Sequence, residues 1–252
     1  MIGRFASTVP LYAQFRPPYP AAFFRTVAER LGFSKQHALI DLGTGPGLLA
    51  LGFAAYVGRI VGVDPEPAMI AAAREAPARA GQAFALIEGK AEQLPHDVGT
   101  FEVVTIGRAL HWMDRTVIAA VFERLVAPHG VIVVCSARSA ADGRNPWLDE
   151  YNAARQFWSG TDGSAHRRQD LAALLGGTRF GLAETIKVES NHEITPRDLA
   201  QRVLTFSTSS PAVLGDRAGA MLADVEQRMQ RFSREGAITE IVVSKAEIAR
   251  AT

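Results

Sequence analysis

The stretch "DLGTGPGLLAL" at residues 41–51 constrains this chain most, because three glycines occupy five positions directly behind a carboxylate. It follows the apolar residues "ALI" and leads into a segment with helical spacing. A strand, a tight glycine turn and a helix in this order are typical of the first crossover of a doubly wound α/β sheet, where ligands bind at the carboxyl ends of strands. Gly43, Gly45 and Gly47 let a ligand approach the backbone without a Cβ in the way. The stretch therefore predicts a ligand site.

The remainder of the chain supports an α/β class. Short β-branched runs alternate with segments of helical spacing in the first half, and helical patterns dominate the second half. The predicted strands are 37–43, 59–64, 84–89, 101–107, 130–136, 181–190 and 237–250. The predicted helices are 47–56, 67–80, 116–128, 147–158, 169–175, 196–206 and 213–233. In the first helix of the second half, the spacing of Trp147, Phe157 and Trp158 predicts core positions.

We predict one domain over residues 1–252, because no linker or repeat interrupts the pattern. Within it, residues 33–136 form the cofactor-binding half and residues 137–236 contribute a helical cap and the substrate pocket. Residues 237–252 form the last strand.

The spacing of the glycines selects among nucleotide ligands. A dinucleotide-binding loop requires G-x-G-x-x-G, but the sixth position counted from Gly43 is Leu48, and no Walker sequence occurs. Asp41 would repel a pyrophosphate and attract a cation. S-adenosylmethionine carries an ammonium and a sulfonium and no phosphate, so it fits this loop better than a dinucleotide does.

A second acidic residue, Asp64, ends the next predicted strand. A carboxylate there can accept hydrogen bonds from both hydroxyls of a ribose. Met69 and Ile70, on the helix that follows, offer an apolar surface near an adenine ring. Taken alone, an aspartate at the end of a strand is more often a helix cap than a ligand, but behind the glycine loop we interpret Asp64 as a ribose ligand.

Charge and composition limit the kinds of partner that this chain is expected to have. The formal net charge is +1 and the basic residues are scattered, so neither a nucleic acid nor a membrane surface is indicated as a partner. The chain has no apolar run long enough for a signal peptide or a membrane span. Cys135 lies in an apolar run and is expected to be a buried thiol. We expect a cytoplasmic monomer or homodimer that acts on a small molecule.

Four segments resemble, in order, the motifs of class I S-adenosylmethionine-dependent methyltransferases that act on small molecules, the methyltransferase type 11-like family. These segments are "ALIDLGTGPGLLAL", "IVGVDPEPAMIAAAR", "GKAEQLP" and "FEVVTIGRALHWMD". "YAQFRPPYP" and "APHGVIVV" resemble the flanking segments. The resemblance implies a Rossmann-like doubly wound sheet of seven strands in the order 3-2-1-4-5-7-6, the last strand antiparallel, with a helical cap. It also implies S-adenosylmethionine as cofactor and S-adenosylhomocysteine as product.

The resemblance further implies roles for single residues in cofactor binding. The glycines follow the methionine moiety, Asp41 lies near its ammonium through water or backbone, and Asp64 binds the ribose. Lys90 departs from the family, since many relatives have an aspartate there. The implied cofactor-binding residues are Tyr12, Arg16, Asp41, Gly43, Thr44, Gly45, Gly47, Asp64, Pro65, Met69, Ala91, Glu92, Gly107 and Arg108.

Candidate residues for the acceptor follow the fourth predicted strand. His111 is a possible general base or orienting group, although relatives commonly carry His-Trp here as a pocket wall. Trp112 is placed to stack on the acceptor or close the pocket. The small hydroxyl residues of 206–217 break the helical pattern, which makes Phe206, Ser207 and Ser210 further candidates, with helix capping as the alternative. No metal ligands are predicted.

The acceptor is expected to be an aromatic or heterocyclic metabolite, methylated on oxygen or nitrogen by direct in-line displacement. A small carboxylic acid anchored by Arg16 or Arg108 is the competing substrate. Two alternatives from other classes are an NAD-dependent oxidoreductase and a non-catalytic subunit that binds S-adenosylmethionine.

Overall fold

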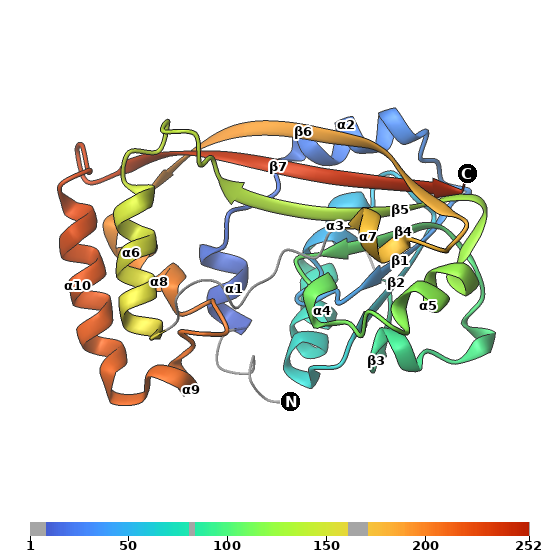
Figure 1. Ribbon diagram of the computed structural model, residues 1–252, viewed down its shortest axis with the longest axis horizontal. Coiled ribbons are helices and arrows are strands. Elements are labelled where there is room, and N and C mark those ends of the chain that lie inside the picture. The colour runs from blue at the N-terminus through green and yellow to red at the C-terminus, as the bar shows by residue number, and fades with distance from the viewer. Residues whose placement is uncertain (1–8, 81–83, 161–170, 252) are drawn as a thin grey trace. The chain divides into compact units, whose positions relative to one another are not determined.

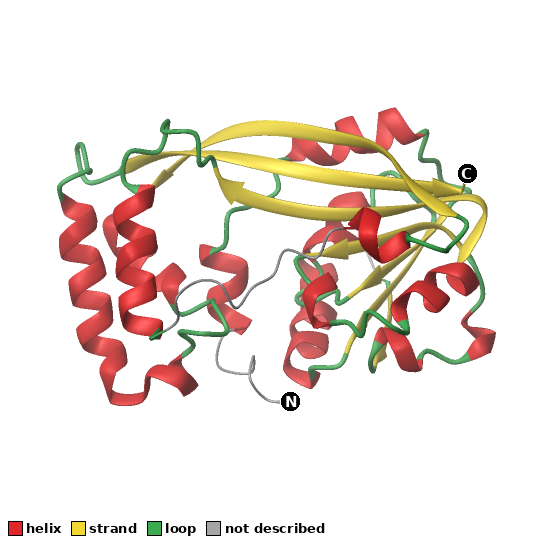
Figure 2. Ribbon diagram, viewed as in Figure 1, coloured by secondary structure: helices red, strands yellow, loops and turns green. Residues whose placement is uncertain are grey.

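The computed structural model describes residues 9–80, 84–160 and 171–251, and these divide into two compact units (Figures 1 and 2). We call them the sheet unit and the helical unit. Within the described ranges, the sheet unit comprises Tyr19–Ser136, Arg167–Val188 and Ser244–Thr252. The helical unit comprises Met1–Pro18, Ala137–His166 and Glu189–Val243. Each unit has its own hydrophobic core.

Seven strands form one sheet in the order β3-β2-β1-β4-β5-β7-β6, with β7 antiparallel, which confirms the predicted topology. The strands are β1 (Ala38–Leu42), β2 (Arg59–Asp64), β3 (Ala85–Glu88), β4 (Phe101–Gly107), β5 (Val126–Ser139), β6 (Phe180–Ile194) and β7 (Ile238–Ala251). The parallel register pairs Asp41 with Gly62 on one side and with Thr105 on the other. The carboxyl ends of β1, β2 and β4 therefore meet at one edge of the sheet.

Helices cover both faces of the sheet in the sheet unit. Side chains alternate along β1, so Leu39 joins the core beneath α2 and α3 while Ile40 joins the core beneath α5. The helices are α1 (Val9–Phe15), α2 (Ala21–Leu31), α3 (Leu48–Phe53), α4 (Pro67–Ala80), α5 (Ile118–Leu125), α6 (Leu148–Ser159), α7 (Leu171–Leu175), α8 (Pro196–Val203), α9 (Pro211–Leu214) and α10 (Ala218–Gln230). Across the described ranges, none of these helices has the length and apolar character needed to cross a membrane.

Some predicted boundaries were wrong. The helix expected over 116–128 ends at Leu125, because Val126 already pairs with Phe101 and begins β5. The helix expected over 213–233 is divided at Gly215, whose φ of 55° is left-handed. Helix α8 ends at Val203 instead of at residue 206. Residues 169–170 of the helix predicted over 169–175 lie outside the described residues.

In the helical unit, α6 and α8 both pack against α10 around one apolar core (Figure 1). Trp147 is buried there together with Tyr151 and Met221. Trp158 borders this core, but Phe157 is 72% exposed, so its predicted core position was wrong. With 3.6 residues per turn, Trp147, Tyr151 and Trp158 share one face of α6, while Phe157 is turned about 100° away from Trp158.

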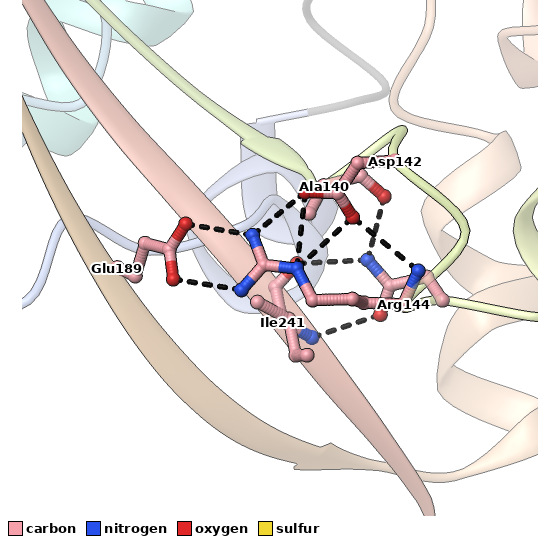
Figure 3. A network of polar contacts seen from close by, with 6 residues as sticks. Ala140, Asp142, Arg144, Glu189 and Ile241 are labelled. Carbon is pink, nitrogen blue, oxygen red and sulfur yellow. Dashed lines mark hydrogen bonds and ion pairs between the residues drawn. The ribbon is translucent and has the colours of Figure 1, made fainter.

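The chain between β5 and α6 is held by a polar network (Figure 3). The Asn145 amide donates to the carbonyl oxygens of Ala140 and Ile241 and accepts from the Ile241 N–H, each at 2.9 Å. The Arg144 guanidinium binds both Asp142 and Glu189 at 2.7–2.8 Å. Asn145 thereby satisfies backbone groups that the end of β5 leaves open, which fixes where α6 begins.

Candidate functional site

The candidate site lies in the sheet unit, at the edge where β1, β2 and β4 end. Three segments meet there: the glycine loop 43–47, the turn after Asp64, and the residues that follow Gly107. The N–H groups of Gly43 and Thr44 both donate to the Val63 carbonyl, at 2.8 and 2.9 Å. The loop after β1 is therefore fastened to the end of β2.

The three loop glycines share a backbone conformation, and Gly43 and Gly45 differ in what surrounds them. All have a positive φ, of 70° at Gly43, 54° at Gly45 and 87° at Gly47, which L side chains rarely adopt. A Cβ on Gly43 would overlap the Ala109 Cβ, so this glycine lets the segment after β4 pack onto the loop. A Cβ on Gly45 would meet nothing closer than the Met69 sulfur at 3.9 Å. Gly45 is thus the position where the loop backbone is open to a ligand.

Asp64 joins the glycine loop to the turn after β2. Its Oδ2 accepts from the Gly45 N–H at 2.8 Å, and its Oδ1 accepts from the Glu66 N–H at 2.9 Å. Burial raises the pKa of Asp64, and these two N–H groups oppose that rise. An ionised carboxylate accepts about four hydrogen bonds, so both oxygens retain a lone pair. Asp64 can therefore hold the loop and still accept from two ligand hydroxyls.

Asp41 is buried beneath the loop, and its carboxylate is held by two threonines. Thr44 donates to its Oδ2 and Thr105 donates to its Oδ1, both at 2.7 Å. Burial raises the pKa of Asp41 from 3.8 to about 6, although the two hydroxyls lower it in part. The predicted role of Asp41 near a ligand ammonium, through water or backbone, stays a prediction.

The raised pKa of Asp41 makes a pH-dependent contribution to stability. Because the folded chain holds this proton more tightly than the unfolded chain, folding stability falls as pH rises from 3.8 through about 6. Asparagine cannot ionise. We therefore expect Asp41→Asn, relative to the parent, to gain about 2 kcal/mol of unfolding free energy between pH 4.5 and 7.5. Urea unfolding without cofactor at these two pH values measures the gain. The expectation would be contradicted if the unfolding free energies of variant and parent differed by the same amount at both pH values.

The other predicted cofactor residues of the sheet unit lie around this edge with different exposures. Met69 and Ala91 are buried, whereas Pro65 is exposed. Glu92 is half-buried, and its Oε1 accepts from the Asp114 N–H at 2.7 Å. Gly107 ends β4, and Arg108 follows with a φ of 57° and its guanidinium 4.9 Å from the Tyr19 ring centroid.

The predicted acceptor residues His111 and Trp112 follow β4 in the same unit. Both are exposed, Trp112 by 47%, and their ring centroids are 4.8 Å apart with an interplanar angle of 44°. Ala109, two positions before His111, is the residue that packs against Gly43. The aromatic pair therefore follows closely in the chain on a residue whose methyl group packs onto the glycine loop.

Five further predicted residues lie in the helical unit. The Arg16 guanidinium carbon is 5.1 Å from the Tyr12 ring centroid and 3.9 Å from that of Phe206, and Arg16 Nη2 donates to the Thr205 carbonyl at 2.8 Å. These residues are therefore brought together. Ser207 is half-buried, and Ser210, at the start of α9, is buried without capping it through its side chain.

Sequence reasoning missed two residues that the structure places beside predicted ones. Thr105 donates a hydrogen bond to Asp41. Predicting this contact requires the register in which β1 pairs with β4, because that register places Thr105 opposite Asp41. Arg155, on α6, stacks on Phe206 with its guanidinium carbon 3.5 Å from the ring centroid. Only its spacing of four residues from Tyr151 hinted that it faces the interior of its unit.

Comparison with known proteins identifies the family. Residues 39–130 match the model of a family described as "Methyltransferase domain". These residues include the glycine loop, Asp64 and the segment after β4. These residues form the domain of a class I S-adenosylmethionine-dependent methyltransferase. An uncharacterized methyltransferase of Mycobacterium tuberculosis is 29% identical over 211 residues, which cover 82% of this chain and 79% of the relative.

Solved structures share the fold of this methyltransferase. A protein from Anaeromyxobacter dehalogenans, described as a type II methyltransferase, aligns with a TM-score of 0.63 and 21% identity, over 94% of this chain and 98% of that one. A methyltransferase from Geobacter sulfurreducens, solved in complex with S-adenosylhomocysteine, aligns with a TM-score of 0.59 and 16% identity over 98% of both chains. The family match decides for S-adenosylmethionine over the dinucleotide alternative.

Proposed function

We propose that this methyltransferase transfers the methyl group to an oxygen or nitrogen of a small aromatic or heterocyclic acceptor. The observation that carries the proposal is the exposed His111–Trp112 pair at the carboxyl edge of the sheet. An exposed tryptophan is a surface on which a flat ring stacks favourably. Ala109, two positions before His111, packs onto Gly43 of the glycine loop.

The residues at this edge fit S-adenosylmethionine. Gly45 leaves backbone open, and Asp64 has lone pairs for the two ribose hydroxyls. When bound, the cofactor supplies an electrophilic methyl group that the acceptor atom displaces in line from the sulfonium. The proposed cofactor-binding residues are Tyr12, Arg16, Asp41, Gly43, Thr44, Gly45, Gly47, Asp64, Pro65, Met69, Ala91, Glu92, Gly107 and Arg108.

The proposed tasks of the acceptor residues are positioning and proton removal. Trp112 orients the acceptor ring, and the His111 imidazole either accepts the proton of a hydroxyl or ring N–H or hydrogen-bonds the acceptor in place. Phe206, Ser207 and Ser210 are proposed as further acceptor contacts from the helical unit. The division into a cofactor-binding half at 33–136 and a cap at 137–236 remains part of this proposal, as do a cytoplasmic location and a monomeric or homodimeric state.

Trp112→Ala tests the aromatic acceptor. We expect the KM for a phenolic or indolic acceptor to rise about tenfold or more, because a stacking surface is lost, while the affinity for S-adenosylhomocysteine stays the same. Transfer of a labelled methyl group across a panel of phenols, indoles, purines and aliphatic amines measures this. Val117→Ala, which shortens another exposed apolar side chain of the sheet unit, is the control. Methylation of aliphatic amines alone, or an unchanged KM, would refute the proposal.

A further inference from the structure

An acidic side chain behind β3 reaches the segment that follows β4. Residues Ala91–Gln93 form a 3₁₀ turn, which we call the β3 turn, and residues Leu110–Trp112 form another, which we call the β4 turn. From the β3 turn, Glu92 Oε1 accepts a hydrogen bond from the Asp114 N–H at 2.7 Å. The carboxylate is therefore bonded to the backbone two residues beyond Trp112.

This hydrogen bond lies where the β4 turn passes into α5. The N–H groups of Trp112 and Met113 each donate to the carbonyl three residues earlier. The carbonyl of Asp114 accepts from the Ile118 N–H at 2.9 Å, at the start of α5. Between these two sets of backbone bonds, the Asp114 N–H turns to the side chain of Glu92. Glu92 thus closes the gap between the turn that ends at Trp112 and the helix that follows it.

The two turns also share apolar packing. Ala91 and Leu94, from the β3 turn and its end, belong to the same buried cluster as Leu110 and Met113. Apolar packing is non-directional, whereas a hydrogen bond joins one donor to one acceptor along a preferred direction. The bond from Asp114 therefore adds an orientation that the packing of these apolar side chains does not give.

The β3 turn is itself fixed on both sides. Before it, the Gly89 N–H donates to the Asp64 carbonyl at 3.0 Å, at the end of β2. After it, the Arg124 guanidinium, on α5, donates to the carbonyls of Leu94 and Pro95 at 3.0 and 2.8 Å. The carboxylate therefore projects from a support that is attached both to the proposed ribose ligand and to α5.

We propose that Glu92 is a positioning residue for the acceptor, because its bond to the Asp114 N–H holds the β4 turn and the Trp112 ring in place. The carboxylate acts through Trp112 and does not touch the acceptor. The inference rests on the proposed function, in which Trp112 stacks on the acceptor ring. The part of Glu92 that borders the cofactor is then its backbone.

Fluorine NMR of the full chain labelled with 5-fluorotryptophan tests the position of the ring directly. The chain has three tryptophans, so three signals are expected, and Trp112→Phe assigns one of them. The other two, Trp147 and Trp158, lie in the helical unit and serve as internal references. We expect Glu92→Ala to shift or broaden the Trp112 signal and to leave both reference signals unchanged.

Two further variants control this experiment. Glu92→Gln keeps one side-chain oxygen that accepts the Asp114 N–H, so its Trp112 signal is expected close to that of the parent. Gln93→Ala removes the neighbouring exposed side chain of the same turn and is expected to change none of the three signals. Thermal unfolding of each variant verifies that it folds.

Kinetics and titration separate positioning from cofactor binding. With a phenolic or indolic acceptor, we expect Glu92→Ala to raise the acceptor KM about fivefold, because a charge-assisted hydrogen bond that holds the turn is lost. The kcat at saturating acceptor is expected to stay close to that of the parent, as is the affinity for S-adenosylhomocysteine measured by calorimetry. Glu92→Gln is expected to restore most of the KM, which a general loss of stability would not predict.

An unchanged Trp112 signal in Glu92→Ala overturns the proposal. Weaker binding of S-adenosylhomocysteine together with an unchanged acceptor KM also overturns it and assigns the carboxylate to the cofactor. If no aromatic acceptor is methylated by the parent, the proposed function fails, while the Trp112 signal still decides whether Glu92 positions the β4 turn.

Discussion

Glu240→Gln is expected to lower the free energy of unfolding by about 3–5 kcal/mol, because it leaves the Arg202 guanidinium as an uncompensated buried charge. Arg202 donates to both oxygens of Glu240 at 2.7 Å. Arg202 is 4% exposed and Glu240 is fully buried, so water cannot replace the lost carboxylate. Arg202 Nε also donates to the Phe15 carbonyl at 2.6 Å, which ties the α1 segment to α8. The loss therefore affects the core of the helical unit and not only one pair of side chains.

A double variant distinguishes the free-energy cost of the unpaired buried charge from the cost of a changed side-chain shape. Arg202→Met combined with Glu240→Leu removes both charges, and we expect it to be more stable than Glu240→Gln alone. Chemical denaturation at pH 7 measures all variants. Glu226→Gln, at an exposed position on α10, is the matched control and should change stability by less than about 0.5 kcal/mol. A cost of Glu240→Gln similar to that of Glu226→Gln would show that the pair does not support the helical unit.

Asp64→Ala is expected to weaken binding of S-adenosylhomocysteine by about 100-fold or more. Two charge-assisted hydrogen bonds to the ribose would be lost, each contributing about 1.5–3 kcal/mol. The Gly45 N–H would lose its acceptor as well, so the open position of the glycine loop would no longer be fastened to the end of β2.

Asp64→Asn distinguishes the loss of hydrogen bonds to the ligand from the loss of the hydrogen bond to the glycine loop. The asparagine oxygen still accepts one backbone N–H, so we expect the variant to keep the fold and to lose less affinity than Asp64→Ala. Titration calorimetry with S-adenosylhomocysteine gives the affinities, and Asp97→Ala, at an exposed position of the sheet unit, is the control. Equal affinities of Asp64→Ala and the parent would remove Asp64 from the cofactor site.

Local patterns in the sequence determined much of the sheet unit. The run 59–64 and the run 101–107 coincide with β2 and β4, because β-branched residues flanked by turn residues specify strands over a few positions. The glycine loop was readable for the same reason: a positive φ is a property of a single residue. Helix boundaries were less readable, since Val126 has β propensity but follows a helix without a break.

Contacts between distant segments were decided by the tertiary structure. Thr105 reaches Asp41 only because β1 and β4 pair in one particular register, and Arg155 reaches Phe206 only because α6 and the loop after α8 share a core. The residues of the glycine loop followed from the sequence by itself, because they depend on local conformation and motif spacing. The strand order was implied by the resemblance of its motifs to those of class I methyltransferases. The partners of Asp41, Arg155 and Glu240 depended on packing, since a side chain carries no local signal of which distant group will balance its charge.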